Sequence, residues 1–554
     1  MRLLEPLRPP YDPLAWARQP LAERGRAVCE AWAMQGYGTP LGVFLLYGLK
    51  IALYVLGWAL ACGTSPSLGG LDTIGRWWLE PLAFQKAIVW SALFEVLGLG
   101  CGSGPLTGRY LPPIGGALYF LRVGTTKLSP FAGAPLVGGD TRGALDVTLY
   151  AALLVALAVA LVAPTVTPAH AGVIVLVLAL AGARDKTIVL AFRAEHYAVT
   201  LLVFALAPTT AEALAGAQGV QLALWFFAGF SKLNHHFPTV VCVMTSNGPL
   251  TPWGWLRRAM YRDFPRDVRP SRLATWIGHG GTALELGVPI LFVLTPSGQA
   301  PVAAVIAMFA LHLYILSNIP MGVPLEWNVM VMYGALALFW AHPDLSFSAA
   351  PAGILALVGV VSWLLPVIGN VWPARVSFLW AMRYYAGNWP CSIWLFRGDS
   401  YRKLDRLTKS APWVHDQLAP LYDRATAVGL VGKVMGFRLM HLHGRALPLL
   451  VPRAVDDLAA YEWVDGELVA GLALGWNFGD GHLHHEQLLA AIQRQCGFEP
   501  GELRCIFLEG QPIQRQALAY RIADAATGPI EAGELPIAEL RTRQPWSATA
   551  EAPR

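Results

Sequence analysis

The stretch WFFAGFSKLNHHFP, from Trp225 to Pro238, decides how the rest of the chain is interpreted. It ends an apolar run of about 20 residues, which is the length that a helix needs to cross a bilayer. The end of this stretch nevertheless contains an amine, at Lys232, and two imidazoles, at His235 and His236. An ionisable group in a membrane segment is costly, so it indicates either a functional site or a side chain that reaches the headgroups.

The whole composition agrees with a membrane protein. Apolar residues make up 55% of the 554 residues and charged residues only 14%, whereas a soluble domain averages about 25% charged residues. The mean hydropathy is +0.46. The net charge of +5 is small and no basic tract occurs, so we expect no nucleic-acid partner.

Ten hydrophobic segments predict an all-α polytopic membrane domain of about ten transmembrane helices. Loops rich and poor in Arg and Lys alternate along these segments, which predicts that both termini are cytoplasmic. Low lysine with high arginine and alanine usage is typical of a GC-rich bacterium, so we expect a bacterial inner (plasma) membrane. The run 114–123 is too short to span and is either re-entrant or interfacial. The ten segments are 41–62, 82–101, 145–163, 169–183, 194–208, 211–230, 276–294, 300–317, 324–341 and 351–371.

The chain divides into three predicted parts. Residues 1–40 form a cytoplasmic segment whose weakly amphipathic helix lies either on the membrane surface or in the cytosol. Residues 41–371 form the transmembrane domain. Charges and turn signals return after residue 372, so residues 372–554 predict a small α+β cytoplasmic domain that folds separately from about residue 400.

Short patterns predict the elements of this C-terminal domain. YEWVDGELVAGLALGW indicates a hairpin with its turn at Asp465-Gly466. HHEQLLAAIQRQCGF indicates a helix, and LRCIFLEG and QALAYRIAD indicate two strands.

Three ionisable residues at a similar predicted depth indicate one shared polar cavity. Lys232, His279 and His312 come from three consecutive membrane segments and are the candidate catalytic residues. A lysine acts as a general base only if its pKa falls far below about 10.4, which burial and neighbouring imidazolium groups favour. The alternative is that buried charges pair to hold helices together, especially at Lys50 and Glu95. The candidate substrate-binding residues are His235, His236, Glu285 and Glu326.

No metal site is expected from the histidine spacing. His279 and Glu285 are six residues apart, about 240° around a helix, and do not share a face. Neither H-E-x-x-H nor a pair of Cys ligands occurs. The histidines of GDGHLHHEQ, residues 479–487, and those at His441 and His443 are therefore interpreted as solvated side chains.

A family resemblance adds to this interpretation. FFAGFSKL resembles the aliphatic-A-G-x-x-K-L signature of the vitamin K-dependent gamma-carboxylase-like (horizontally transferred) transmembrane domain, and HGGTALELGVPILFVLTP and FALHLYILSNIPMG resemble its next two helices. The resemblance covers roughly residues 211–341. In the carboxylases the matching lysine deprotonates the reduced quinone cofactor, which implies that role for Lys232, with His279 and His312 lining the site.

Two departures argue against glutamate carboxylation. Ser231 stands where the animal enzymes have a second lysine, and the predicted cytoplasmic tail contrasts with the lumenal one of those enzymes. Over its full length the chain also resembles a bacterial family of polytopic membrane proteins without an assigned function.

Three functions stay open at this point. The first is a membrane-embedded enzyme in which a lysine base acts on a lipophilic substrate, quinone-like or lipid. The second is a transporter or channel in which the same charges form a path for a substrate or for protons. The third is a membrane scaffold whose cytoplasmic tail carries the function. Membrane lipids and a lipophilic small molecule are the expected partners. The sequence leaves the cofactor, the reaction and the oligomeric state open.

Overall fold

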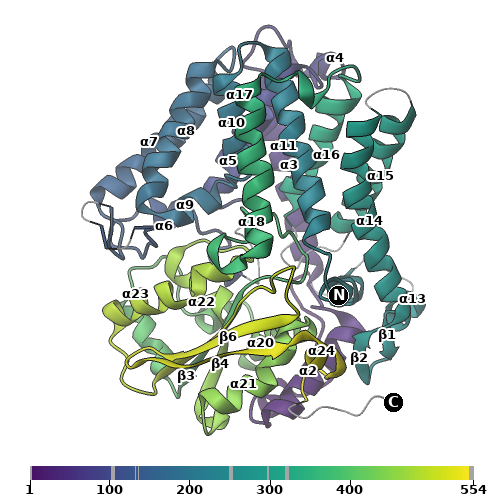
Figure 1. Cartoon of the computed structure of the whole chain (residues 1–554). Coiled ribbons are helices and arrows are strands. Elements are labelled where there is room, and N and C mark those ends of the chain that lie inside the picture. Colours follow the sequence, from purple (N-terminus) through teal and green to yellow (C-terminus); the bar gives the residue numbers. More distant parts are fainter. Residues whose placement is uncertain are drawn as a thin grey trace.

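The computed structural model describes residues 3–101, 107–131, 133–134, 137–248, 254–295, 299–317 and 324–547. A bundle of long helices occupies one end of the molecule, and a unit of shorter helices around a sheet occupies the other (Figure 1). The first part of the chain, in purple near the N label, lies beside that second unit.

The bundle consists of helices that coincide with all ten predicted segments. Turns of π-helix continue α16 and join α17 to α18. The bundle helices are α3 (Leu41–Cys62), α5 (Pro81–Val96), α7 (Ala144–Val162), α8 (Pro168–Arg184), α10 (Tyr197–Leu206), α11 (Thr210–Phe230), α14 (Arg272–Leu294), α15 (Gln299–Leu316), α16 (Leu325–Ala335), α17 (Ala352–Val358) and α18 (Leu365–Val371).

Within the described residues, five helical stretches are long and apolar enough to cross a membrane: α3, α7, α11, α14 and Ala352–Val371. The prediction of ten full spans is therefore not confirmed. The reason is length, because α10 has 10 residues and rises about 15 Å, half of a hydrocarbon core of about 30 Å. Shorter apolar helices such as α8 and α10 complete the bundle.

The bundle has an apolar outer surface, and α11 lies at its centre. Of the apolar stretch of α11, 89% is buried, against 11% for α3. α11 packs against α10, α14, α16 and α17. Leucines along α3 point outward, as expected for a helix that faces lipid rather than water; they are Leu45, Leu49, Leu53 and Leu56.

The second unit is built on a five-stranded antiparallel sheet with the order β4-β3-β5-β6-β7. The predicted strands at LRCIFLEG and QALAYRIAD and the predicted helix at HHEQLLAAIQRQCGF are confirmed. The elements are β3 (Cys391–Arg397), β4 (Tyr461–Asp465), β5 (Leu503–Leu508), β6 (Ala517–Asp524), β7 (Gly528–Pro536), α20 (Arg424–Met440), α21 (Leu447–Ala454), α22 (Gly466–Leu474), α23 (Glu486–Cys496) and α24 (Ile537–Thr542).

The hairpin predicted at Asp465-Gly466 is wrong, because a helix, α22, follows β4 directly. The Asp465 carboxylate accepts a hydrogen bond from the backbone N–H of Glu467 and caps the helix. Gly475, at φ 83°, ends it in the left-handed conformation. The dipeptide Asp-Gly therefore starts a buried helix here instead of turning a hairpin.

The N-terminal segment packs on the second unit. α1 (Pro13–Trp16) and α2 (Leu21–Gln35) contact α20, and α2 buries Val28 and Trp32. Lys433 on α20 donates hydrogen bonds to the carbonyl oxygens of Leu7 and Tyr37, at 2.9 and 2.6 Å. The amphipathic face of α2 therefore covers protein rather than lying free on a membrane or in solvent.

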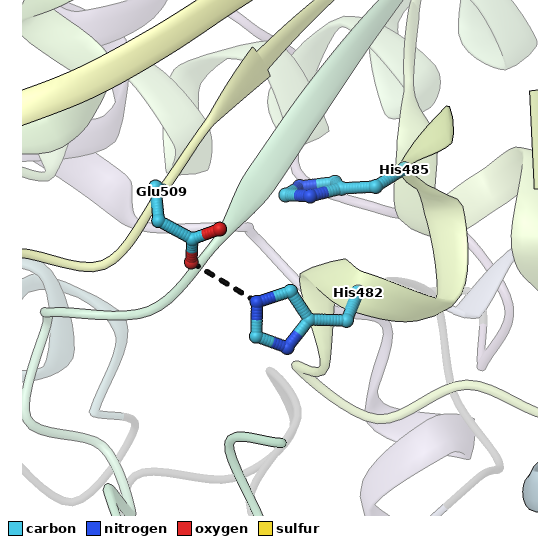
Figure 2. A group of neighbouring side chains, drawn as sticks. All are labelled: His482, His485 and Glu509. Carbon is cyan, nitrogen blue, oxygen red and sulfur yellow. Dashed lines mark hydrogen bonds and ion pairs between the residues drawn. The ribbon is translucent and has the colours of Figure 1, made fainter. Parts of the chain in front are cut away.

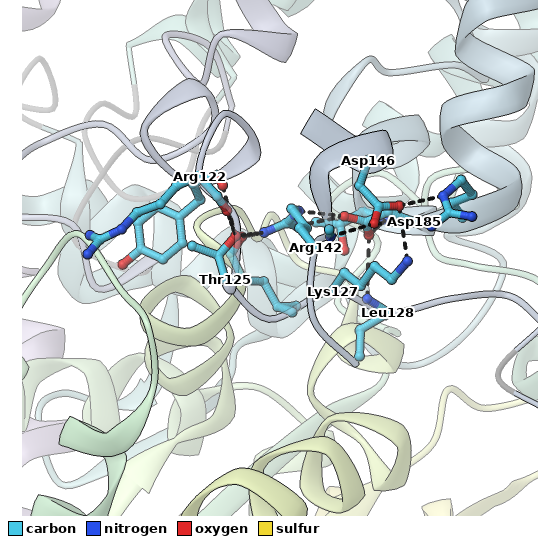
Figure 3. Close-up of polar contacts among 12 residues, drawn as sticks. Arg122, Thr125, Lys127, Leu128, Arg142, Asp146 and Asp185 are labelled. Atoms are coloured by element: carbon cyan, nitrogen blue, oxygen red, sulfur yellow. Dashed lines mark hydrogen bonds and ion pairs between the residues drawn. The ribbon is translucent and has the colours of Figure 1, made fainter. Parts of the chain in front are cut away.

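Buried ion pairs fix the loop between α5 and α7 (Figure 3). Lys127 and Arg184 both bind the Asp146 carboxylate, at 3.0 and 2.7 Å, and Arg142 binds Asp185 at 2.7 Å. In the run 114–123, the short helix α6 (Ala117–Phe120) buries Tyr119, whose hydroxyl donates to Leu472 O at 2.9 Å. This run therefore lies between the bundle and the second unit.

The arginine-rich loops of the bundle end on the same side as the second unit. Arg109 donates to Gly471 O, Arg122 donates to Lys409 O at 3.0 Å, and Arg142 donates to Leu474 O at 3.4 Å. The N-terminal segment lies on this side too.

Candidate functional site

A cavity of about 370 Å³ opens between the bundle and the second unit, within the usual size range of a small-molecule site. It lies among α11, α14, α15, the start of α16, and α12 (Phe237–Asn247). Its wall is mainly apolar and includes Leu224, Val240, Val241, Met244, Ile277, Leu284, Leu311 and Ile315.

Lys232 and Glu285 form an ion pair in the wall of this cavity. Lys232 Nζ lies 2.5 Å from Glu285 Oε2, and both residues are buried. The amine also lies over the ring of Phe237, 4.6 Å from its centroid. Lys232 follows directly after the C-cap of α11, where the partial negative charge of the helix end favours an ammonium.

Gly229 brings the two partners together. A Cβ at Gly229 would lie 2.9 Å from Glu285 Cβ and 3.0 Å from the backbone nitrogen of Leu286. The absence of a side chain therefore lets α11 and α14 approach closely enough for Lys232 to reach Glu285. This gives a physical reason for the glycine in AGFSKL.

His312 lines the cavity with both ring nitrogens occupied. Its Nδ1 lies 2.8 Å from Asn328 Oδ1, and Asn328 Nδ2 donates to Pro324 O at 2.7 Å. Trp225 Nε1 donates to His312 Nε2 at 3.2 Å. The ring is thus a neutral imidazole that donates from Nδ1, with no lone pair left for a ligand. His312 holds Trp225 and Asn328 in place.

His279 and His235 lie outside the cavity. The expectation that His279 shares the cavity with Lys232 is wrong, because its exposed ring packs against the exposed Trp276. Gly281 and Glu285, four residues apart, put the cavity on one face of α14, and His279 is on another. His235 is also exposed, 3.4 Å from an Arg541 nitrogen.

His236 anchors the turn that carries Lys232 to the second unit. Its Nε2 lies 2.9 Å from Gln511 Oε1. Gln511 O accepts from Arg383 at 2.7 Å and from Asn388 at 2.9 Å. Burial lowers the pKa of His236 to about 3, so the ring is neutral at physiological pH. It acts on the cavity by positioning Lys232.

Glu326 faces away from the cavity into a second buried polar cluster. Lys50 Nζ lies 3.0 Å from Glu326 Oε2. Glu326, Glu95 and Cys101 each place one ligand-type atom within 4.8 Å of the others. The expected role of Glu326 at the same site as Lys232 is therefore not met, although the neighbouring Trp327 does line the cavity.

Arg193 connects this cluster to the cavity wall. It donates to Cys101 Sγ at 3.0 Å and to Glu195 at 2.7 Å. Tyr384, which lines the cavity, donates to the same Glu195 oxygen at 3.1 Å. Arg193 has a φ of 55°, a conformation that side chains rarely adopt and that is found at functional sites.

Residues beyond 372 complete the cavity, and sequence reasoning missed them. Phe378, Tyr384, Tyr385 and Phe478 line it. Tyr385 has a φ of 46°. Only the cluster of aromatic residues in RYYAGNWP could have singled out this loop, because it lies about 150 residues from Lys232 in the chain.

The interpretation of the C-terminal histidines as solvated is wrong. His441, His443 and His484 are fully buried, and His485 is 4% exposed. One nitrogen of each ring has a polar neighbour: His441 Nδ1 pairs with Phe437 O at 2.7 Å, and His484 Nδ1 with the Ser392 hydroxyl at 2.7 Å. Burial lowers the pKa of His441 to about 3, so it too is neutral.

Comparison with known proteins identifies a family whose function is unknown. A family model described as a transmembrane protein of unknown function, DUF3556, matches residues 1–554. Neither the curated proteins nor the solved structures give a match. The apolar bundle and the full-length match agree, and the chain belongs to DUF3556, a family of transmembrane proteins of unknown function.

Proposed function

We propose that this protein binds a lipophilic molecule in the cavity, with the polar head of that molecule at Lys232 and Glu285. One observation carries the proposal: among the described residues that line this mainly apolar cavity, Lys232 and Glu285 alone are charged. An apolar pocket with a few convergent polar groups is the usual form of a small-molecule site.

The outer wall of the cavity supports entry from the membrane. Ile277 on α14 and Tyr314 on α15 line the cavity, and these two residues are 37% and 46% exposed on the bundle surface. Gly280 lies beside them, and a Cβ there would meet no atom within 4 Å. A membrane-dissolved molecule would therefore reach the ion pair sideways, between α14 and α15.

The pair is suited to handle a proton. Transfer of one proton from Lys232 to Glu285 turns ammonium and carboxylate into a neutral amine and a neutral acid, and the contact of 2.5 Å allows this transfer. The neutral amine can then accept a proton from the hydroxyl of a quinol-like ligand. The resemblance of FFAGFSKL to the carboxylase signature supports this role for Lys232, with quinone-like compounds as the ligand class.

The orientation is part of the proposal. We place residues 1–40 and 372–554 on the cytoplasmic side of a bacterial inner membrane, because the arginine-rich loops lie on their side of the bundle. The bundle, residues 41–371, then carries the ion pair of the site, and the carboxylase-like core, residues 211–341, supplies Lys232, Glu285 and His312.

The buried cluster behind the cavity favours a second candidate, a proton-coupled transporter. Lys50, Glu326, Glu95, Arg193 and Glu195 form a chain of ionisable residues that ends on Tyr384 in the cavity wall. Such residues inside a membrane bundle mark ion and proton pathways.

Native mass spectrometry of the purified protein tests the ligand proposal. We expect a bound lipophilic molecule in the wild type and its loss in Gly281→Leu, which places a side chain in the cavity. Gly287→Leu is the matched control, because Gly287 lies on the same helix, outside the cavity, with no atom within 4 Å of an added Cβ. Equal ligand retention in the two variants would contradict the proposal.

Proton flux tests the second candidate. In liposomes with a pH-sensitive dye inside, a transporter loses flux on Tyr384→Phe and keeps the ligand. A wild-type protein without flux excludes this candidate and leaves the ligand proposal standing.

A further inference from the structure

Two histidines and a glutamate, none of which lines the cavity, gather in the second unit (Figure 2). His482 lies on the 3-10 turn Gly481–His484, His485 directly precedes α23, and Glu509 follows β5. One nitrogen of each ring and one carboxylate oxygen all lie within 4.8 Å of one another. His482 Nε2 is 3.0 Å from Glu509 Oε1.

The outer nitrogen of each ring already has an acceptor. His482 Nδ1 lies 3.4 Å from Asp480 Oδ1, and His485 Nε2 donates to Cys391 O at 3.3 Å. Metal-binding histidines characteristically donate their second N–H to a carboxylate or a backbone carbonyl. In this structure His482 Nε2–H donates to Glu509 Oε1, whereas His485 Nδ1 keeps a lone pair that faces Arg521. A metal ion that displaces the proton of His482 Nε2 would meet lone pairs on both rings on the side of Glu509.

Carboxylates and cations both surround the two imidazoles. Asp480 and Glu509 face His482, and Arg521 contacts Glu486 and Glu509. Lys186 and Arg383 also act electrostatically on Asp480 and Glu509. Asp480 is fully buried, and its Oδ2 has no hydrogen-bond partner among the described residues.

We propose that His482, His485 and Glu509 bind one divalent transition-metal ion such as Zn²⁺, with Asp480 and Cys391 O as the positioning partners. Two imidazoles and one carboxylate are a ligand set for Zn²⁺ or Fe²⁺ that keeps a coordination position open. In a tetrahedral zinc site with bonds of about 2.0–2.1 Å, ligand atoms lie roughly 3.3 Å apart. The His482–Glu509 spacing is already close to this value, so His485 would make the main adjustment.

Arg521 competes with the ion. One of its nitrogens lies 3.4 Å from His485 Nδ1, and another pairs with Glu486. On metal binding the guanidinium would lose its contact with His485 Nδ1 and retain its ion pair with Glu486. The side chain is 36% exposed, so it has room to move. His482 is 20% exposed and gives the ion a path from solvent.

Metal titration of the full-length protein, purified with a tag that lacks histidine and stripped with a chelator, tests the site. We expect one equivalent of Zn²⁺ by elemental mass spectrometry and calorimetry, and a Co²⁺ visible absorption band. Glu509→Gln and His485→Ala should lose this equivalent, and Asp480→Asn should weaken the affinity about 10–100-fold. Arg521→Ala should tighten it.

His415→Ala is the control, because His415 also lies near a glutamate, Glu462 at 3.4 Å, in the same unit but apart from the cluster. It should bind as the wild type does. A wild type that takes up no Zn²⁺ and gives no Co²⁺ band overturns the proposal without recourse to any variant. Unchanged stoichiometry in both Glu509→Gln and His485→Ala overturns it as well, and a melting temperature raised by Zn²⁺ in the wild type alone supports it.

Discussion

Lys232 Nζ lies 2.5 Å from the carboxylate of Glu285. Lys232 follows the end of α11, and α11 meets α14, which carries Glu285, at Gly229. The pair is buried in the wall of a mainly apolar cavity. A buried ion pair is weak evidence for stability, but a buried charge that has lost its partner is strongly destabilising. Replacing one member of the pair should therefore reduce stability much more than replacing both members together.

Lys232→Met should lower stability by about 3–5 kcal/mol, because it leaves the Glu285 carboxylate buried without a partner. A purified sample in detergent, followed by thermal melting, measures this. If Lys232 were an unpaired neutral base, the same change would barely move the melting temperature.

The double variant Lys232→Met with Glu285→Leu is the control for this prediction. Removing both charges should restore most of the lost stability while ligand retention stays lost. Additive losses in the double variant would show that the two residues act independently.

Gly229→Ala should destabilise the bundle by about 1–3 kcal/mol, because the new methyl group would overlap Glu285 Cβ and the backbone of Leu286. The measurement is a melt in the same detergent. Gly287→Ala on α14 meets no atom within 4 Å and should be neutral or stabilising, as expected for Gly to Ala in a helix. Equal effects of the two substitutions would exclude close helix approach as the role of Gly229.

Lys433 should make stability rise with pH above 8. Burial lowers its pKa from 10.5 to about 8 in the folded protein. Between these values the unfolded chain holds the proton and the folded chain has lost it, so stability increases with pH. Below pH 8 both states are protonated, and the full cost of the buried charge remains.

The comparison with Lys433→Met isolates this effect. Between pH 8 and 10.5, the free energy of unfolding of the wild type should rise relative to that of the variant by up to about 3 kcal/mol. This value follows from about 1.36 kcal/mol for each unit of pKa shift. Parallel pH profiles of the two proteins would contradict the prediction.

Separate folding of the tail from about residue 400 stays a prediction, and it depends on contacts that α2 makes with this part of the chain. The fragment lacks the cover that α2 gives to α20, where Val28 packs against Gly436 and Trp32 against Phe437. We expect a peptide of residues 1–40 to bind the fragment and raise its melting temperature. The same peptide with Val28→Asp and Trp32→Ala should do neither. A fragment that melts cooperatively without any response to the first peptide would refute this dependence.

Some of the site follows from local pattern and some does not. The apolar run before Lys232 and the glutamate in the next helix could be found in the sequence, because the cost of membrane burial singles out such residues wherever they occur. The exclusion of His279 could also have been inferred from its angle to Glu285 on the helix. The pairing of Lys232 with Glu285 could not, because it depends on how closely α11 and α14 approach.

The sequence by itself determined that this is a helical membrane protein with an appended α+β unit, because hydropathy and side-chain periodicity are properties of local stretches. It also determined where the helices of the bundle lie, although not which of them span. Only the tertiary structure decided that Tyr384 and Phe478 close the cavity, that Glu326 faces a different cluster, and that His482, His485 and Glu509 converge. These contacts join residues far apart in the chain, and packing in three dimensions, rather than any local pattern, brings them together.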